Sequence, residues 1–182
     1  MKTNIKKALK LLTLLISSLL ITTVSASVYY SLTMYSTVSV ATTDVYFVLG
    51  ADNATAGVTL NSDNTTATLT ALKAYPNATT TYGDPLRVRN NATSGTTNIR
   101  LRPVSLSGSA TNFIFINFTL TDGTTNYASL NYTSDGSAWT TPSTTSWVPI
   151  PASTEWYVTI ETKAKEGATS DSVSIVIAVD VE

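Results

Sequence analysis

Carboxylates are the only side chains in this sequence from which an acid–base active site could be built. The 182 residues include no histidine and no cysteine, which excludes thiol nucleophiles, Cys/His zinc sites and any histidine-based triad. The twelve acidic residues occur singly, and Asp122 and Asp135 each precede a glycine, as is typical of hairpin turns. Paired carboxylates of the glycosidase kind and the aspartate-rich loop of an EF-hand are not indicated. The sequence therefore predicts no enzyme, no cofactor and no metal site.

Asparagine side chains offer a second kind of chemistry, because Asn-x-Ser/Thr triplets are acceptors for N-linked glycans. The triplets begin at Asn53, Asn64, Asn77, Asn91, Asn117 and Asn131. A chain rich in Thr and Asn produces such triplets by chance, so their use depends on an oligosaccharyl transferase in the host. The first four lie in predicted turns, and we expect glycans there and at Asn131. Asn117 is doubtful, because it alternates onto the strand face of Phe113 and Phe115 and is expected to be hidden.

The amino-acid composition excludes several classes of protein. Charged residues make up 13% and hydrophobic residues 43% of the chain, which is too apolar for a disordered protein and poor in charge for a cytosolic one. Four lysines fall in the first ten residues, which leaves seven basic against twelve acidic residues in the remainder. Nucleic acid is therefore excluded as a partner. The large side chains of the three tryptophans are expected to pack in the core or at a subunit interface rather than to form a sugar-binding platform. They are Trp139, Trp147 and Trp156.

The first residues have the pattern of a secretory signal. Lys2, Lys6, Lys7 and Lys10 precede the apolar run Leu11–Val24, and Val24-Ser25-Ala26 supplies small residues for a signal peptidase. We expect residues 1–26 to be removed. The alternatives are a retained membrane anchor or the long N-terminal helix of a type IV pilin. Both are disfavoured because the pattern after Ala26 alternates with a period of two, which indicates a strand.

The sequence pattern of the mature chain predicts a series of short strands. Segments rich in β-branched residues recur between Gly, Asp, Asn and Pro, without helical periodicity longer than two turns. We predict an all-β fold, a single jelly-roll-like or Ig-like β-sandwich of about ten strands over residues 36–182. The expected strands are Val28–Tyr35, Val38–Leu49, Gly57–Leu60, Ala67–Leu72, Leu86–Arg89, Thr97–Leu106, Asn112–Leu120, Tyr127–Tyr132, Ser146–Ile150, Glu155–Thr162 and Ser172–Val181.

The segment that follows the predicted cleavage site is unusual. Ser27–Tyr35 is apolar, aromatic and uncharged, and no Gly, Pro, Asn or Asp separates it from the next strand through Thr43. A hairpin is therefore not expected, and an uninterrupted strand of this length exceeds the usual five to six residues. We interpret residues 27–35 as a strand that leaves its own domain and pairs with the open sheet edge of a neighbour. Its inward side chains would be Val28, Tyr30, Leu32 and Met34.

The whole chain resembles secreted filament subunits of the TasA/camelysin type and the similar archaeal bundling pili and threads. The resemblance rests on a signal peptide that runs directly into a strand (SVYYSLTMYSTVSVATTDVYFVLGAD), a body rich in Thr and Asn, and two C-terminal strands (EWYVTIETKAKEGATSDSVSIVIAVDVE). It implies polymerisation outside the cell by donor-strand exchange. Camelysin is described as a metalloprotease, but this chain lacks histidine to hold such a metal, so that activity is not expected here.

Three classes of function remain open. The first is the structural subunit of an extracellular filament at the cell surface, for cell–cell adhesion or biofilm formation, with identical subunits, N-linked glycans and other filaments or cell surfaces as partners. The second is a cell-surface adhesion or S-layer-associated β-sandwich domain that does not polymerise. The third is an enzyme or sugar-binding module, which a cluster of exposed tryptophans around one groove would favour.

Overall fold

The computed structural model describes residues 6–15, 44–169 and 172–182. The chain divides into two compact units, Met1–Ala41 and Thr42–Glu182. In the first unit residues 6–15 form an exposed helix. No helix in the described ranges has the length and apolar character needed to cross a membrane. The predicted signal peptide 1–26 lies largely outside the described residues, and the predicted donor strand 27–35 lies entirely outside them.

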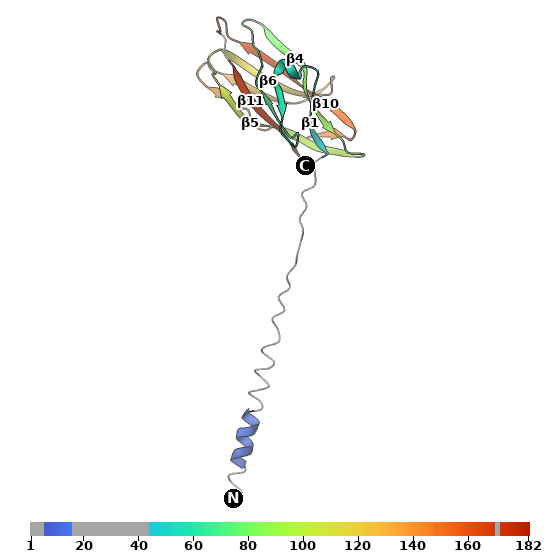
Figure 1. The fold of residues 1–182 in the computed structure, drawn as a ribbon, viewed down its shortest axis with the longest axis vertical. Helices are drawn as coiled ribbons and strands as arrows, with labels where there is room; N and C mark the ends of the chain where they lie inside the picture. The colour runs from blue at the N-terminus through green and yellow to red at the C-terminus, as the bar shows by residue number, and fades with distance from the viewer. Residues whose placement is uncertain (1–5, 16–43, 170–171) are drawn as a thin grey trace. The chain divides into compact units, whose positions relative to one another are not determined.

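The second unit is a sandwich of two antiparallel sheets (Figure 1). The six-stranded sheet has the order β1-β4-β10-β6-β7-β8. Its strands are β1 Val45–Leu49, β4 Thr79–Asn90, β10 Thr154–Ala164, β6 Phe113–Thr121, β7 Asn126–Ser134 and β8 Trp139–Thr140. The five-stranded sheet has the order β2-β3-β11-β5-β9. Its strands are β2 Val58–Leu60, β3 Thr66–Leu69, β11 Val173–Val181, β5 Thr96–Gly108 and β9 Val148–Pro151. The predicted all-β sandwich is therefore confirmed, with eleven strands in the described ranges.

The core follows from the period-two pattern of the central strands. In β11 the side chains of Val173, Ile175, Ile177 and Val179 are buried, as the alternation predicts. In β10, which lies between β4 and β6, Trp156, Val158 and Ile160 are buried and the residues between them are half-buried. These faces form one hydrophobic cluster between the sheets.

Two buried polar side chains bind the sandwich together. Asn90, at the end of β4, is fully buried, and its Nδ2 donates to the carbonyl oxygen of Ile150 in β9 at 3.0 Å. Its Oδ1 accepts from the Ala92 amide at 3.0 Å. Thr162 in β10 donates its hydroxyl to the Lys73 carbonyl at 2.5 Å. Because buried polar groups are stable only when paired, Asn90 links the six-stranded sheet to the edge strand of the other sheet.

The sequence prediction differs from the structure in three elements. The predicted strand Leu86–Arg89 is too short, because β4 starts at Thr79 and continues through Gly83, Asp84 and Pro85. The two-residue strand β8 and the four-residue helix α2, Asn53–Ala56, were not predicted. The first half of β4 was missed because it contains residues typical of turns. Strand β8 and helix α2 were missed because they are too short to show a periodic pattern.

The predicted faces of β6 are wrong at its start. The pattern placed Phe113, Phe115 and Asn117 on one face, whereas Phe113 is buried and Phe115 and Asn117 are half-buried on the opposite face. The cause is a register shift between β6 and β10, where Lys163 pairs with Phe115 but the next residue, Ala164, pairs with Phe113. A bulge of this kind changes which residues face the core. In the sheet, β6 lies between β10 and β7.

Candidate assembly surface

One long stretch of β5 has a strand neighbour on one side only. β11 pairs with β5 from Ile99 to Gly108, but β9 pairs with it only along Thr96–Ile99. Beyond β9, Thr145 continues the pairing at Leu101, donating its amide to the Leu101 carbonyl and accepting from the Leu101 amide with its hydroxyl, both at 3.0 Å. Along the segment Arg102–Gly108, which we call the open edge, β11 is the only strand neighbour among the described residues. Such an edge can accept an added strand.

The open edge carries apolar side chains that the fold leaves partly uncovered. A bulge opposite Val176 and Ile177 makes Val104 an extra residue in β5, and its side chain is 47% exposed. Leu106 is half-buried against the core. The edge ends at Gly108, which has φ +115° and approaches the Ser172 carbonyl so closely that a Cβ would lie 2.4 Å from that oxygen. Only glycine fits at that position.

The strands across from the open edge are also incompletely paired. β8 pairs with β7 only at Thr133 and Ser134, which leaves Asn126–Tyr132 with β6 as its one strand neighbour in the described ranges. After β8, residues 141–147 cross from the six-stranded sheet to β9 in the other sheet. Half-buried Ala128, Trp139 and Val148 line this side of the core together with Leu106. The side formed by β5 and β7 is therefore the one where the sandwich is least closed.

Two buried polar atoms on this side have no partner in the described part of the chain. They are the hydroxyl oxygen of Tyr132 in β7 and Nε1 of Trp139 in β8. Burial raises the pKa of Tyr132 to about 12, so the hydroxyl stays protonated at neutral pH. Buried polar atoms without a partner are rare in native proteins. Both lie next to the incomplete strand pairing described above.

The opposite side of the sandwich is closed more completely. The Phe47 amide in the edge strand β1 donates to the Asn64 carbonyl in the β2–β3 turn at 2.6 Å. The other edge strand there, β2, has only three residues, and the Thr70 amide continues its pairing to Gly57 at 3.2 Å. Short and capped edges of this kind resist strand addition. Within the described ranges the β5/β7 side therefore has longer unpaired strand edges than the β1/β2 side.

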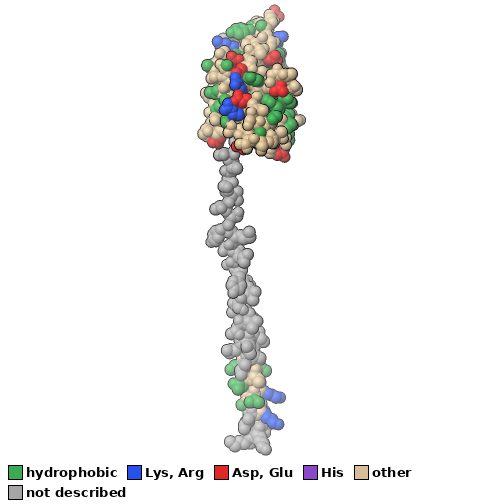
Figure 2. Space-filling view, turned by 90° about the vertical axis from the view of Figure 1, so that its right-hand side faces the viewer, with side chains coloured by type: hydrophobic (Ala, Val, Ile, Leu, Met, Phe, Trp, Pro, Cys, Tyr) green, Lys and Arg blue, Asp and Glu red, His purple; other side chains and the backbone are tan. Residues whose placement is uncertain are grey.

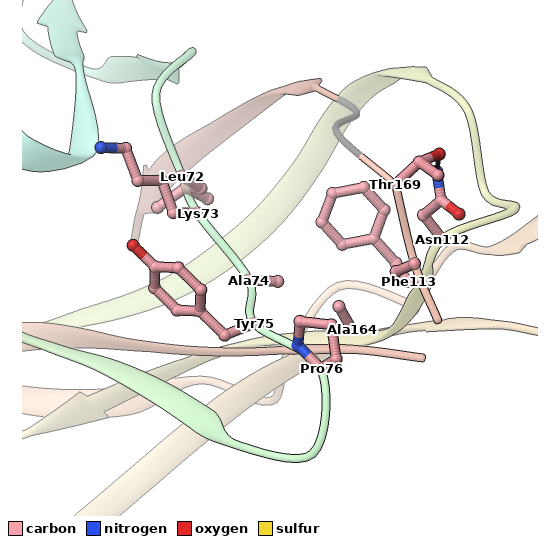
Figure 3. A pocket seen from close by; sticks show the side chains of 10 residues that line it. Leu72, Lys73, Ala74, Tyr75, Pro76, Asn112, Phe113, Ala164 and Thr169 are labelled. Carbon is pink, nitrogen blue, oxygen red and sulfur yellow. Dashed lines mark hydrogen bonds between the residues drawn. The ribbon is translucent and has the colours of Figure 1, made fainter. Parts of the chain in front are cut away.

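A hollow of about 350 Å³ lies between residues 72–76 and the start of β6. Figure 3 shows Tyr75 and Pro76 on one side of it, and Asn112, Phe113 and Thr169 on the other. Its floor is apolar, with Leu72, Phe113 and Ala164 each nearly fully buried. Because Phe113 also contacts Trp139 with 5.5 Å between ring centroids, the hollow adjoins the β5/β7 side.

The three tryptophans contact different partners. Trp156 is buried and stacks on Tyr127 with ring centroids 4.1 Å apart, Trp139 contacts Phe113, and exposed Trp147 lies beneath the Arg100 guanidinium at 4.3 Å. The three rings do not form a common sugar platform, and the most exposed of them, Trp147, is 37% exposed. Asp122 and Asp135 lie in hairpin turns as predicted, where their carboxylates accept from backbone amides at 2.7–2.8 Å. These contacts lower the pKa of both carboxyls.

Other charged side chains pair with one another on the outer faces of the sheets. Arg87 bridges Asp84 at 2.5 Å and Glu155 at 3.1 Å, and Arg89 also pairs with Glu155. On the other sheet Asp180 holds Arg100 and Arg102 at 3.1 and 3.0 Å. Figure 2 shows basic and acidic atoms side by side in a narrow band on one face, among largely neutral atoms. Within the described ranges no group of three or more acidic residues is placed to hold a metal ion.

The asparagines of the Asn-x-Ser/Thr triplets differ in their exposure. Asn77 and Asn91 are exposed, Asn64 is half-buried in a turn at φ +55°, and Asn53 begins α2 with its Nδ2 donating to the Gly50 carbonyl at 2.5 Å. Asn131 is exposed in β7. Asn117 is half-buried on the outer face of β6, so the expectation that it shares the buried face of Phe113 is wrong. Its Nδ2 donates to the Thr119 hydroxyl at 3.2 Å.

The chain matches no family model and no curated protein sequence. Its function is therefore inferred from the pattern of the sequence and from the incomplete edge of the sandwich. The predicted inward side chains lie outside the described residues; they are Val28, Tyr30, Leu32 and Met34.

Proposed function

We propose that this chain is a secreted structural subunit that polymerises into a filament at the cell surface, used in cell–cell adhesion or biofilm formation. In this proposal the signal peptide is removed after Ala26, and Ser27–Tyr35 of one subunit adds as a strand to the open edge Arg102–Gly108 of the next. The observation that carries the proposal is that, among the described residues, Arg102–Gly108 of β5 has a strand neighbour on one side only, beside partly exposed apolar Val104.

The dimensions of donor and acceptor support the pairing. At about 3.3 Å per residue, Ser27–Tyr35 spans roughly 30 Å and the open edge roughly 23 Å. The donor has no charge and no proline that would interrupt a ladder of backbone hydrogen bonds. Its alternation places Val28, Leu32 and Met34 on one face together with Tyr30, and each of the three apolar side chains contributes roughly 1.5–3 kcal/mol when fully buried.

The same alternation sets the register of the added strand. A slip by one residue would turn Tyr29, Ser31, Thr33 and Tyr35 inward. Their hydroxyl groups would then need hydrogen-bond partners in an apolar site, which costs free energy if they are missing. The two chemically distinct faces therefore favour one register over its neighbour.

The test is deletion of residues 27–35 from the exported chain, followed by electron microscopy of cell-surface preparations. We expect a secreted, folded subunit that forms no filaments and aggregates through its uncovered edge. Adding the free peptide SVYYSLTMY should restore its solubility but not filament formation, because the peptide fills the edge without linking subunits.

A matched pair of point variants separates strand addition from general effects on export. Leu32→Asp places an unpaired charge on the inward face and should block assembly, whereas Thr33→Asp places the same charge on the outward face and should not. Normal filaments from the deletion variant would overturn the proposal. In that case Ser27–Tyr35 would be an ordinary edge strand of a monomer.

A further inference from the structure

A second hollow lies on the outer face of the six-stranded sheet, away from the open edge of β5. It has a volume of about 290 Å³ and is lined by Phe115 and Asn117 of β6, Ser129 and Asn131 of β7, and Glu161 of β10. The strand register explains the grouping, because Asn117 pairs directly with Glu161 on one side and with Asn131 on the other. Five side chains from three adjacent strands therefore converge on one place.

Most polar side-chain groups that line this hollow have no hydrogen-bond partner among the described residues. The side chains of Ser129, Asn131 and Glu161 make no hydrogen bond or ion pair with another described residue, and Asn117 Oδ1 is buried without a partner. Asn117 uses only its Nδ2, which donates to the Thr119 hydroxyl. The hollow thus presents amide, hydroxyl and carboxylate groups, both donors and acceptors, beside one half-buried aromatic ring.

We propose that this hollow is a saccharide subsite that holds one pyranose ring against Phe115. A sugar presents C–H groups on its ring face, which suit the negative face of an aromatic ring, and hydroxyls on its edge, which both donate and accept. A sugar hydroxyl pointing inward would donate to Asn117 Oδ1.

The charges near the hollow disfavour other ligand classes. Glu161 is the only charged residue that lines it, and Lys163, two residues further along β10, lies beside Phe115 in the register. An acidic lining repels phosphate polymers, and a single half-buried phenylalanine gives too little apolar area for the core of a protein interface. A neutral saccharide is compatible with both features.

The ring could come from either of two sources. One is a free neutral polysaccharide outside the cell, and the other is a glycan attached to Asn131 of the same chain, whose exposed side chain lines the hollow. The chemistry is the same in both cases. The experiment therefore has one arm for each source and uses the same variants in both.

In the first arm the full chain is produced in a host without N-glycosylation and titrated by NMR with cellopentaose and with chitopentaose. We expect saturable shifts, and a loss of affinity of about fivefold or more in Phe115→Ala. Ile114→Ala is the matched control, because Ile114 is a neighbouring exposed apolar residue of β6 that does not line the hollow. Glu161→Gln, which keeps the side-chain size, gives a second variant should Phe115→Ala fold poorly.

In the second arm the chain carries a glycan at Asn131, and its thermal midpoint is compared with that of the unglycosylated chain. If the attached glycan fills the hollow, Phe115→Ala lowers the midpoint more in the glycosylated chain than in the unglycosylated one, whereas Ile114→Ala lowers both equally. Either result supports the subsite and identifies its source. Absence of oligosaccharide binding in the first arm together with equal midpoint changes in the second overturns it.

Discussion

Val104→Asp is the sharpest test of the acceptor edge, because Val104 is exposed in the free subunit and would be covered in the polymer. Burying a valine side chain completely is worth roughly 1.5–3 kcal/mol, and 47% of Val104 is exposed. Strand addition would therefore bury about half of it, roughly 0.7–1.4 kcal/mol. The substitution should leave the subunit folded, since exposed positions usually change the unfolding free energy by no more than about 0.5 kcal/mol.

The introduced charge adds a larger penalty. The nearest cations on β5, Arg100 and Arg102, are both held by Asp180, so a carboxylate at position 104 would be covered without a partner. An uncompensated buried charge costs several kcal/mol. With the lost burial, assembly should weaken by at least about 3 kcal/mol, which is about a hundredfold or more at roughly 1.4 kcal/mol per factor of ten.

The assay is the critical concentration for polymerisation of the mature chain, measured by sedimentation and checked by electron microscopy. Ile114→Asp is the control, because Ile114 is 38% exposed on β6, a central strand that has two strand neighbours. We expect a raised critical concentration for Val104→Asp and an unchanged one for Ile114→Asp. If Val104→Asp assembles like the wild type while the deletion of residues 27–35 does not, strand exchange stands and β5 is not its acceptor.

Four further outcomes are expected. Asn90→Ala should lower the unfolding free energy by about 2–4 kcal/mol in urea titrations, because it leaves the Ile150 carbonyl buried without its donor. The unfolding free energy should fall on acidification below about pH 4.5, because Arg89 and Arg87 hold the pKa of the Glu155 carboxyl below its usual value. The stability that ionised Glu155 contributes is fully present above the usual pKa and is lost as the pH falls through the lowered pKa. Glu155→Gln should flatten this part of the pH–stability curve. Site mapping by mass spectrometry of chain from a glycosylating host should find more glycan at exposed Asn131 than at half-buried Asn117. Intact mass should place the mature N-terminus at Ser27.

Most of the fold could be predicted from the sequence because the apolar residues of β10 and β11, which lie inside the two sheets, recur at every second position. β11 shows the ideal case, with Val173, Ile175, Ile177 and Val179 all in the core. Failures occur where local chemistry and strand pairing disagree. Gly83, Asp84 and Pro85 are turn-forming residues and lie at an irregularity in the pairing of β4 with β10, yet β4 continues because β10 pairs with it on both sides, at Thr79–Tyr82 and at Leu86–Asn90. Only tertiary pairing overrides such a signal.

The features that define the candidate sites were harder to predict. The bulge in β6 that turns Asn117 outward depends on its register with β10, and a register is a relation between two strands that no single segment encodes. The open edge of β5 is likewise visible only once β9 is seen to end its pairing at Ile99. The donor, by contrast, could be proposed from the sequence alone, because an uncharged strand without turn residues is a local property.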